Sequence, residues 1–428
     1  MEGERASDRR ASAPDRRASA SDRPTEAPER LIAIDVGAGT SDIVIRSAGE
    51  PVENSVKLVV PSPTRVVAAR IRGATRAGAA VVFYGRTMGG GADTRAMKAH
   101  TAAGLPFLAT PAAARTFADD LERVRACGVE IVSDEEADAV IRAGRLHAGR
   151  ASAVQREVVA VRAGDVDAPA LLRAMEALGI PSDFCGAAIA VQDHGFTPDG
   201  SNRAYRFSLW ERAVCERRSL PELFYRADLN EVPERLTRLQ AAVACLAELL
   251  ACHYKSEASD TGTALPILAG DTGPAALLGA LTDAPAAHPP TAPRVLVNVG
   301  NGHTIAVVER AGRLAGVYEH HTGLLDGKQL RDQLQRFLAG RLTTAEVRDD
   351  GGHGAVINEP VDGDLPLLVT GPNRHLLDRS GFRTLYPAPW GDMMIAGAVG
   401  LLEAFAARSG VSKCSPFSSS VSSRSLST

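Results

Sequence analysis

The sequence predicts an α/β protein in which two halves of similar design face one ligand. Two observations support this class. Strand-like apolar runs alternate with helical stretches along most of the 428 residues, and glycine-containing hairpins of the same pattern occur at residues 31–45 and 294–308. A hydrophobic content of 45% is sufficient for two cores in a chain of this length.

The first hairpin opens with Leu-Ile-Ala-Ile-Asp-Val-Gly-Ala-Gly-Thr-Ser-Asp. Gly37 and Gly39 allow backbone N–H groups to approach an anion, and the hydroxyl of Thr40 adds a donor. Asp35 and Asp42 would repel a phosphate, so their presence implies a divalent cation or an attacking water between them and the anion. The alternative is an ordinary glycine-rich turn with an aspartate cap.

The second hairpin repeats this pattern with Asn298 at the place of the first acid, followed by Val-Gly-Asn-Gly and a threonine. Two such turns suggest that each half of the molecule grips the phosphates of one ligand from its own side. The residues expected to bind at this second turn are Gly300, Asn301, Gly302 and Thr304.

A third segment, Leu-Pro-Leu-Leu-Val-Thr-Gly-Pro-Asn from residue 365, predicts a buried strand that opens into a turn. At the turn, Gly371, Pro372 and Asn373 would let a flat ring lie on the backbone. The three segments together therefore predict a nucleotide site.

In motif and order these segments resemble the two phosphate loops and the adenosine loop of the actin, Hsp70 and sugar kinase ATPase superfamily. The resemblance implies two ribonuclease-H-like domains that clamp ATP and a magnesium ion in a cleft between them, with Asp35 at the metal. It implies three binding segments: Asp35, Gly37, Gly39, Thr40 and Asp42; Gly300, Asn301, Gly302 and Thr304; and Gly371, Pro372 and Asn373. The second loop of the superfamily usually opens with an aspartate, so Asn298 implies slow hydrolysis.

Three stretches are also similar to an uncharacterised prokaryotic family, some of whose members are labelled pyruvate formate-lyase-activating proteins. These stretches are residues 35–43, 109–123 and 319–323. Radical activases hold an iron–sulfur cluster through three closely spaced cysteines. No three of the six cysteines here lie close together in the sequence, which argues against radical chemistry.

The expected organisation has four parts. Residues 1–30 repeat Arg-Arg-Ala-Ser units without large apolar side chains after Met1, and the serine-rich end is similarly poor in them, so both are expected to be disordered. The parts are a tail at 1–30, a first ribonuclease-H-like domain with insertions at 31–260, a second at 261–408, and a tail at 409–428.

The first half is expected to begin with antiparallel strands and to add parallel strands through helices. The predicted strands are 31–36, 41–47, 56–60, 64–72, 79–84, 129–132, 157–161 and 187–191. The predicted helices are 93–103, 112–127, 134–144, 168–178, 205–219 and 232–254.

The second half is expected to repeat this order. The predicted strands are 265–269, 294–299, 303–309, 313–319, 365–369 and 382–385, and the predicted helices are 326–338 and 391–407. The last helix carries small residues on one face, which predicts close packing against another helix. By the resemblance, an equivalent helix crosses at the hinge between domains.

Gln192 and His194 follow a predicted strand directly, at the edge of the sheet where α/β proteins bind ligands. Either could orient an attacking water or receive its proton, and Asp193 or His194 could deprotonate an acceptor hydroxyl. A polar strand-to-loop turn without a catalytic role explains the segment equally well.

Three further segments carry weaker signals. Glu319, His320 and His321 could bind a metal, but neighbouring histidines on a strand point to opposite faces, so at most one is expected in the cleft. The glycine-rich loop 84–91, with Arg86, could hold a phosphate or carboxylate or serve as a connector. The segment 270–273 occupies a similar place after a strand.

Composition excludes several classes. A net charge of −3 gives no general attraction to nucleic acid, and no apolar run reaches the roughly 18 residues needed to cross a bilayer. Six cysteines without a framework spacing favour a reducing cytoplasm. Cys245 and Cys252 are expected to be small buried hydrophobes rather than a redox pair.

Three functions are compatible with these observations. The first is an ATP-binding protein that uses Mg²⁺ to hydrolyse ATP or to transfer its phosphoryl group to an unknown small-molecule acceptor. The second is a nucleotide-gated regulatory or enzyme-activating module that acts on a protein partner. A scaffold that has lost catalysis is a third possibility, favoured by Asn298.

Overall fold

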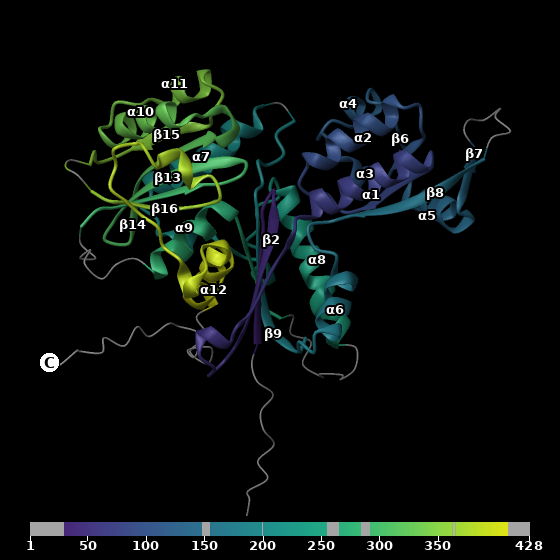
Figure 1. Cartoon of the computed structure of the whole chain (residues 1–428), viewed down its shortest axis with the longest axis horizontal. Helices are drawn as coiled ribbons and strands as arrows, with labels where there is room; N and C mark the ends of the chain where they lie inside the picture. Colours follow the sequence, from purple (N-terminus) through teal and green to yellow (C-terminus); the bar gives the residue numbers. More distant parts are fainter. Residues whose placement is uncertain are drawn as a thin grey trace, which may run out of the picture.

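The computed structural model describes residues 30–147, 155–198, 200–254, 265–283, 292–361, 363 and 365–409. The tails predicted at 1–30 and 409–428 lie outside the described residues, except that Arg30 begins β1 and Ser409 ends α12. The chain is of the α/β class, with three sheets and helices packed around them (Figure 1). No helix in the described ranges combines the length and apolar character needed to span a bilayer.

The first sheet contains both antiparallel and parallel strands. Its order is β10-β11-β9-β1-β2-β3. Strands β1, β2 and β3 form an antiparallel meander, whereas β9 and β11 run parallel to β1. The bounds are β1 Arg30–Val36, β2 Thr40–Ser47, β3 Val56–Pro61, β9 Phe184–Val191, β10 Tyr225–Arg226 and β11 Ile267–Gly270.

The second sheet repeats this topology in the order β15-β14-β13-β12-β16-β17. Strands β12, β13 and β14 form an antiparallel meander. Strand β16 pairs parallel with the edge of β12 that does not face β13. The bounds are β12 Arg294–Val299, β13 His303–Arg310, β14 Arg313–His321, β15 Gly354–Ile357, β16 Leu367–Thr370 and β17 Thr384–Leu385. Strand β12 therefore corresponds to β1, and β16 corresponds to β9. The strand predicted at 265–269 forms as β11, but it joins the first sheet rather than the second.

A third sheet lies between β3 and β9 in the chain. The strands predicted at 79–84, 129–132 and 157–161 form, but they belong to this separate sheet, so the expectation that they extend the first sheet is wrong. The edge strand β3 is exposed at Val59, Val60 and Pro61 and takes no further partner. The bounds are β4 Ala80–Gly85, β5 Phe107–Ala109, β6 Val129–Ile131, β7 Arg145–His147 and β8 Gln155–Ala163, in the order β6-β5-β4-β8-β7.

Residues 64–72, predicted as a strand, lie in helix α1 (Pro63–Ala77). Proline at the first helical position and Gly78 in a left-handed conformation at the end delimit this helix. Its buried side chains include Val67, Ala68 and Ile71, which recur with helical rather than strand spacing. The β-branched residues of this stretch favour a strand locally, but burial of one helical face against the third sheet decides the structure.

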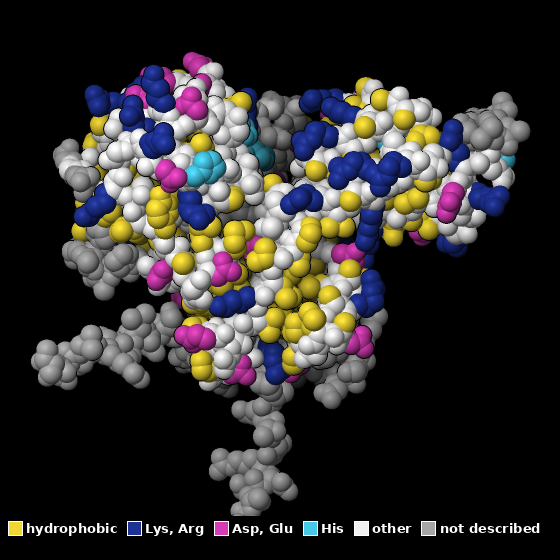
Figure 2. All heavy atoms as spheres, in the orientation of Figure 1, with side chains coloured by type: hydrophobic (Ala, Val, Ile, Leu, Met, Phe, Trp, Pro, Cys, Tyr) yellow, Lys and Arg dark blue, Asp and Glu magenta, His cyan; other side chains and the backbone are white. Residues whose placement is uncertain are grey.

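The other helices of the first half cover the third sheet and the first sheet. The helix predicted at 112–127 is divided into α3 and α4, because Asp120 caps a new helix start by accepting the N–H of Glu122. Figure 2 shows Lys and Arg side chains spread over the side of the molecule on which α1 and α3 lie. The bounds are α2 Ala92–Ala102, α3 Pro111–Ala114, α4 Leu121–Arg125, α5 Asp134–Ala143, α6 Ala168–Ala177, α7 Asn202–Cys215 and α8 Thr237–Tyr254.

Helices α9 (Thr272–Thr282) and α12 (Ala396–Ser409) pack closely between the first two sheets (Figure 1). A Cβ on Gly279 would collide with the backbone carbonyl of Ala396, and a Cβ on Gly400 would collide with that of Ala275. The prediction of close packing at the last helix is therefore confirmed. The helix begins at residue 396 rather than 391, after two short 3-10 turns. Helices α10 (Gly327–Leu338) and α11 (Thr344–Asp349) lie beside the second sheet.

Candidate functional site: a cleft between two glycine hairpins

The two predicted glycine hairpins have the same internal geometry. In the first, the N–H of Gly37 donates to the carbonyl oxygen of Thr40 at 2.9 Å, and in the second, the N–H of Gly300 donates to that of His303 at 2.9 Å. When the two hairpins are aligned by their strand registers, Asp35 in the first occupies the position that Asn298 has in the second. The alignment also matches Thr40 with His303, so the threonine of the first turn has a histidine as its structural counterpart.

The tips of the two hairpins face each other. A Cβ on Gly39 would lie 2.7 Å from Nδ2 of Asn301, so only a glycine fits at this position without displacing the asparagine. The first and second sheets therefore each contribute one hairpin to a common cleft.

The cleft brings together most of the predicted binding residues. Asp35 and Asp42 lie on one wall, Gln192 lies at the end of β9, and the start of β13 lies opposite. The predicted residues that line the cleft are Asp35, Gly37, Thr40, Asp42, Gln192, Gly300, Asn301, Gly302, Gly371 and Pro372.

Four predicted residues lie outside this lining: Gly39, His194, Thr304 and Asn373. Thr304 is fully buried, and its hydroxyl pairs with that of Thr322 at 3.0 Å. Asn373 supports the second hairpin, because its Nδ2 donates to the carbonyl oxygen of Gly300 at 2.9 Å.

Asp35 and Asp42 are buried carboxylates with unpaired oxygens. Each has an Oδ1 atom that is shielded from solvent and has no hydrogen-bond partner among the described residues. Burial, followed by the charges of Asp42 and Asp271, raises the pKa of Asp35 well above its usual value. Burial also raises the pKa of Asp42 to about 6, against the opposing hydrogen bond from Thr40. A divalent cation is the ligand that such a pair would accept.

Two helix N-termini also reach the cleft. Thr272 and Gly273 at the start of α9, and Ala396 and Gly397 at the start of α12, contribute to its lining. The N–H of Gly273 donates to Oδ1 of Asp271 at 2.9 Å, and the N–H of Ala396 donates to the carbonyl oxygen of Met393. The helix dipoles, rather than these two donors, therefore favour an anion here. The segment 270–273 had only a weak signal in the sequence, and the contribution of α12 depends on tertiary packing.

The glycine-rich loop 84–91 reaches the cleft through Gly89 and Gly90, whereas Arg86 is exposed and lies outside the lining.

Arg238 of α8 lines the cleft and links Asp165 to the end of β9. Its Nε and Nη2 donate to the two carboxylate oxygens of Asp165 at 2.9 and 2.8 Å, and its Nη1 donates to the carbonyl oxygen of Gln192 at 2.6 Å. No sequence pattern marked Arg238 or Asp165 as part of the site.

The carboxylate of Asp193 stabilises the local backbone. Its Oδ1 accepts the N–H of Gly195 at 2.8 Å, and its Oδ2 accepts the N–H of Leu239 at 2.9 Å. Burial raises the pKa of Asp193 despite these two hydrogen bonds. Since both oxygens are occupied and the side chain is outside the cleft lining, the structure does not support Asp193 as a base.

His194 lies in a group of histidines at the rim of the second hairpin. Burial, with the nearby Arg206 as the next cause, lowers the pKa of His194 to about 2. Its ring centroid is 5.2 Å from that of His303 and 5.4 Å from that of His353. On β14, His321 contacts His303 with ring centroids 4.6 Å apart, whereas His320 stacks on Tyr318.

A buried ionic network joins the first and second sheets beside these histidines. The Nε of Arg206 donates to Glu319 at 2.8 Å, and its Nη2 donates to Asp271 at 3.0 Å. Burial alone would raise the pKa of Glu319, but Arg206 and a hydrogen bond from His303 outweigh it and hold this pKa well below its usual value. Glu319 is therefore a carboxylate.

Comparisons with known proteins identify a family and find distant structural similarity to solved structures. A chain of the solved "PilM-PilN type IV pilus biogenesis complex" is 14% identical, with 87% of this chain and 98% of that chain covered and a TM-score of 0.34, which is too low to support an argument. A comparison with curated proteins finds no match. A sequence model of the family described as "Putative pyruvate format-lyase activating enzyme (DUF1786)" matches residues 88–376. Since this match spans more than half of the 428 residues, the chain belongs to that family.

Proposed function

We propose that the cleft binds ATP with Mg²⁺, and that the protein is an ATPase or phosphotransferase of the actin, Hsp70 and sugar kinase superfamily. One observation carries this proposal: two hairpins with the same Gly N–H to carbonyl closure face each other across one cleft. The shared topology of the first and second sheets supports assigning them to two ribonuclease-H-like domains. The boundary expected between residues 260 and 261 would separate β11 from the sheet it pairs in, so we place the end of the first domain after Gly270.

The chemistry of the lining fits a phosphate chain. The N–H groups of Gly37 and Gly300 close their own turns, so the backbone donors for a phosphate would be those of the turn residues that line the cleft from its two sides, Ala38 in the first hairpin and Asn301 and Gly302 in the second. Gly371, whose φ is +101°, brings its backbone close to Val299 and leaves Pro372 in the lining, as a wall for a flat base would require.

The carboxylates of Asp35 and Asp42, which also line the cleft, are suited to bind a cation. Two buried aspartates with unpaired oxygens are unfavourable unless they are protonated or paired with positive charge. Mg²⁺ bound through Asp35 or Asp42 and the phosphates would supply that charge and would stabilise negative charge developing on the phosphoryl group. Gln192 lines the cleft close to Gly302, where it could orient a water or an acceptor.

A second function is favoured by Asn298, which occupies the position that Asp35 holds in the first hairpin. An amide cannot supply the charge that a second acid would, so turnover is expected to be slow. The protein would then act as a nucleotide-gated module that regulates or activates a partner protein, with closure around ATP as the signal.

Radical chemistry of the kind that the family label implies is not part of this proposal. In the described part of the chain, Cys127, Cys185, Cys215 and Cys245 lie in different parts of the fold. No three of them lie within metal-ligand distance of one another there. The side chain of Cys252, predicted to be buried beside Cys245, is outside the described residues.

The test is thermal unfolding of the full chain with Mg²⁺ and ATP, ADP, GTP or no nucleotide. A ligand at about 100 times its dissociation constant adds roughly 2.7 kcal/mol to the free energy of unfolding. We expect stabilisation by Mg²⁺–ATP, and phosphate release measured on the same samples separates turnover from gating. If none of the nucleotides stabilises the protein, the assignment of the cleft is contradicted.

A further inference from the structure

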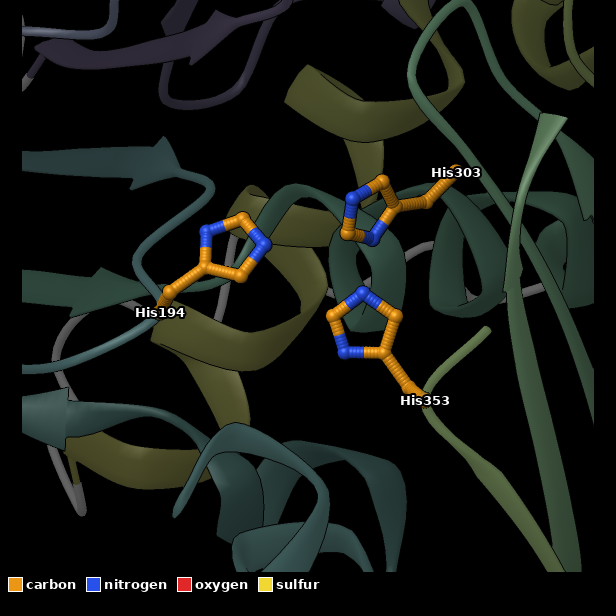
Figure 3. Close-up of side chains that lie close together, drawn as sticks. All are labelled: His194, His303 and His353. Atoms are coloured by element: carbon orange, nitrogen blue, oxygen red, sulfur yellow. The ribbon is translucent and has the colours of Figure 1, made fainter. Parts of the chain in front are cut away.

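Three histidines from distant parts of the chain converge at one point. His194 follows β9, His303 begins β13, and His353 lies between α11 and β15. One nitrogen from each ring lies within 4.8 Å of the others, and Figure 3 shows the rings pointing toward one another. Within the described residues, this is the one group of three or more His, Cys, Asp or Glu side chains that meets this distance.

The group lacks hydrogen bonds that buried imidazoles normally make. His353 is fully buried, and neither its Nδ1 nor its Nε2 has a partner. The Oε2 of Glu319, also fully buried, has none either. A buried polar atom without a partner costs about 1–3 kcal/mol, so three in one place require an explanation.

Glu319 orients one of the rings. Its Oε1 lies 2.8 Å from Nδ1 of His303, which leaves Nε2 of that histidine free to bind a ligand. Nδ1 of His353 lies 3.9 Å from Oε2 of the same carboxylate. A carboxylate behind a metal-binding histidine is the usual arrangement in metal sites, because it fixes the tautomer and raises the basicity of the ring.

The local charge also favours a cation. Arg206 carries one positive charge between the carboxylates of Asp271 and Glu319, which gives this buried network a net charge of about −1. Imidazole nitrogens beside a net negative charge are suited to bind a cation.

We propose that His194, His303 and His353 form a binding site for a divalent transition metal, with Zn²⁺ as the best fit. Imidazole suits Zn²⁺, and three protein ligands with one open position are typical of catalytic zinc sites. Zn–N bonds of 2.0–2.1 Å place tetrahedral ligand atoms roughly 3.4 Å apart, so the rings would close by roughly an ångström on binding. Because His303 also lines the nucleotide cleft, the open position would be available to a ligand there.

The metal site does not require that the cleft bind a nucleotide, so its test measures metal content. Untagged full-length protein is treated with chelator, loaded with Zn²⁺ or Co²⁺, freed of excess metal by gel filtration and analysed by atomic emission. We expect about one metal per chain, and visible absorption bands from tetrahedral Co²⁺.

His353→Ala and His194→Ala should each lose nearly all of the bound metal. His375→Ala is the matched control, because His375 is exposed and lies away from the group. Circular dichroism in chelator establishes that each variant is folded, and His353→Gln replaces a variant that is not. The proposal is overturned if the wild-type protein takes up no stoichiometric metal, or if folded variants at His353 and His194 retain it.

Discussion

Asp35 and Asp42 are direct cross-strand partners in the β1–β2 hairpin. Opposed residues of an antiparallel pair lie on the same face of the sheet, so two carboxylates share one buried wall of the cleft. Burial is the largest cause of the raised pKa of both groups; the charge of Asp42 adds to it at Asp35, and the charge of Asp392 adds to it at Asp42. The pair is unfavourable for folding alone and favourable for binding a cation.

Asp42→Asn should therefore stabilise the free protein and abolish its response to Mg²⁺–ATP. A pKa raised from 3.8 to about 6 corresponds to about 3 kcal/mol as an upper estimate of the gain at pH 7. Chemical denaturation gives the free energy of unfolding, and thermal unfolding with and without Mg²⁺–ATP gives the response. Asp35→Ala should also abolish turnover while the protein remains folded.

The exposed Asp138→Asn is the control for these changes, because Asp138 lies on α5, outside the cleft lining. It should leave both stability and the nucleotide response close to wild type. Unchanged Mg²⁺–ATP turnover in a folded Asp35→Ala protein would remove the first hairpin from the proposed site.

Gly397→Ala should disturb the carboxylate of Asp35, because Gly397 packs directly against it. A Cβ at this position would collide with the carboxylate of Asp35. We expect the variant to lose most of the stabilisation by Mg²⁺–ATP, measured as the shift in unfolding temperature. Gly323→Ala is the matched control, since a Cβ there meets no atom within 4 Å. A folded Gly397→Ala protein with the wild-type shift would contradict the position assigned to Asp35 in binding.

Local patterns predicted the hairpins correctly because their determinants are local. Glycines at Gly37 and Gly300 follow short apolar strands, and the same turn forms in both places. The strands of the second half also form where they are predicted, except that β15 (Gly354–Ile357) is not among the predicted strands and the strand at 265–269, β11, pairs with β9. Which sheet a buried strand joins depends on contacts between distant residues, so the separate third sheet could not be recognised from strand patterns alone.

The histidine group shows the same limit. The sequence suggests His194 as a candidate for proton transfer and allows at most one of His320 and His321 in the cleft, but His303 and His353 carry no sequence signal. His303 was overlooked because Thr304 was aligned with Thr40, whereas the register aligns His303 with Thr40. His353 comes from a loop, and only the tertiary fold brings it to the group.

Asp93 predicts a specific dependence of stability on pH. It is fully buried on α2, its Oδ2 has no partner, and burial raises its pKa from 3.8 to about 6 against the hydrogen bond from Thr94. The folded state therefore holds this proton more tightly than the unfolded state does. Stability should fall as pH rises from about 4 to about 6, by up to about 3 kcal/mol, and should remain lower above that range.

Asp93→Asn should remove this part of the pH dependence and raise the free energy of unfolding at pH 7. Urea denaturation of both proteins at pH 4.5, 5.5 and 7 measures the difference, with Asp138→Asn as the exposed control on α5. Parallel stability curves for wild type and Asp93→Asn across these pH values would show that Asp93 does not titrate as expected.

Arg206 should be the most sensitive position for stability. It is buried, and it joins Asp271 before α9 to Glu319 in the second sheet while also donating to the carbonyl oxygen of Asp193 at 2.9 Å. Arg206→Met would leave the buried carboxylate of Glu319 and the partly exposed carboxylate of Asp271 without their counter-charge, which should cost about 3–5 kcal/mol. Arg206→Lys keeps the charge but cannot form the same forked bonds, so a smaller loss is expected.

The exposed Arg212→Met on the same helix should change stability by about 0.5 kcal/mol or less, as is usual for surface substitutions. Denaturant unfolding of the three variants tests this order. Because Arg206 also holds Glu319 behind His303, its loss should reduce metal uptake as well, whereas Arg212→Met should not. Equal stability of Arg206→Met and Arg212→Met would contradict this role of Arg206. It would mean that Asp271 and Glu319 become protonated or reach solvent once the arginine is removed, so that the network does not hold the two sheets together.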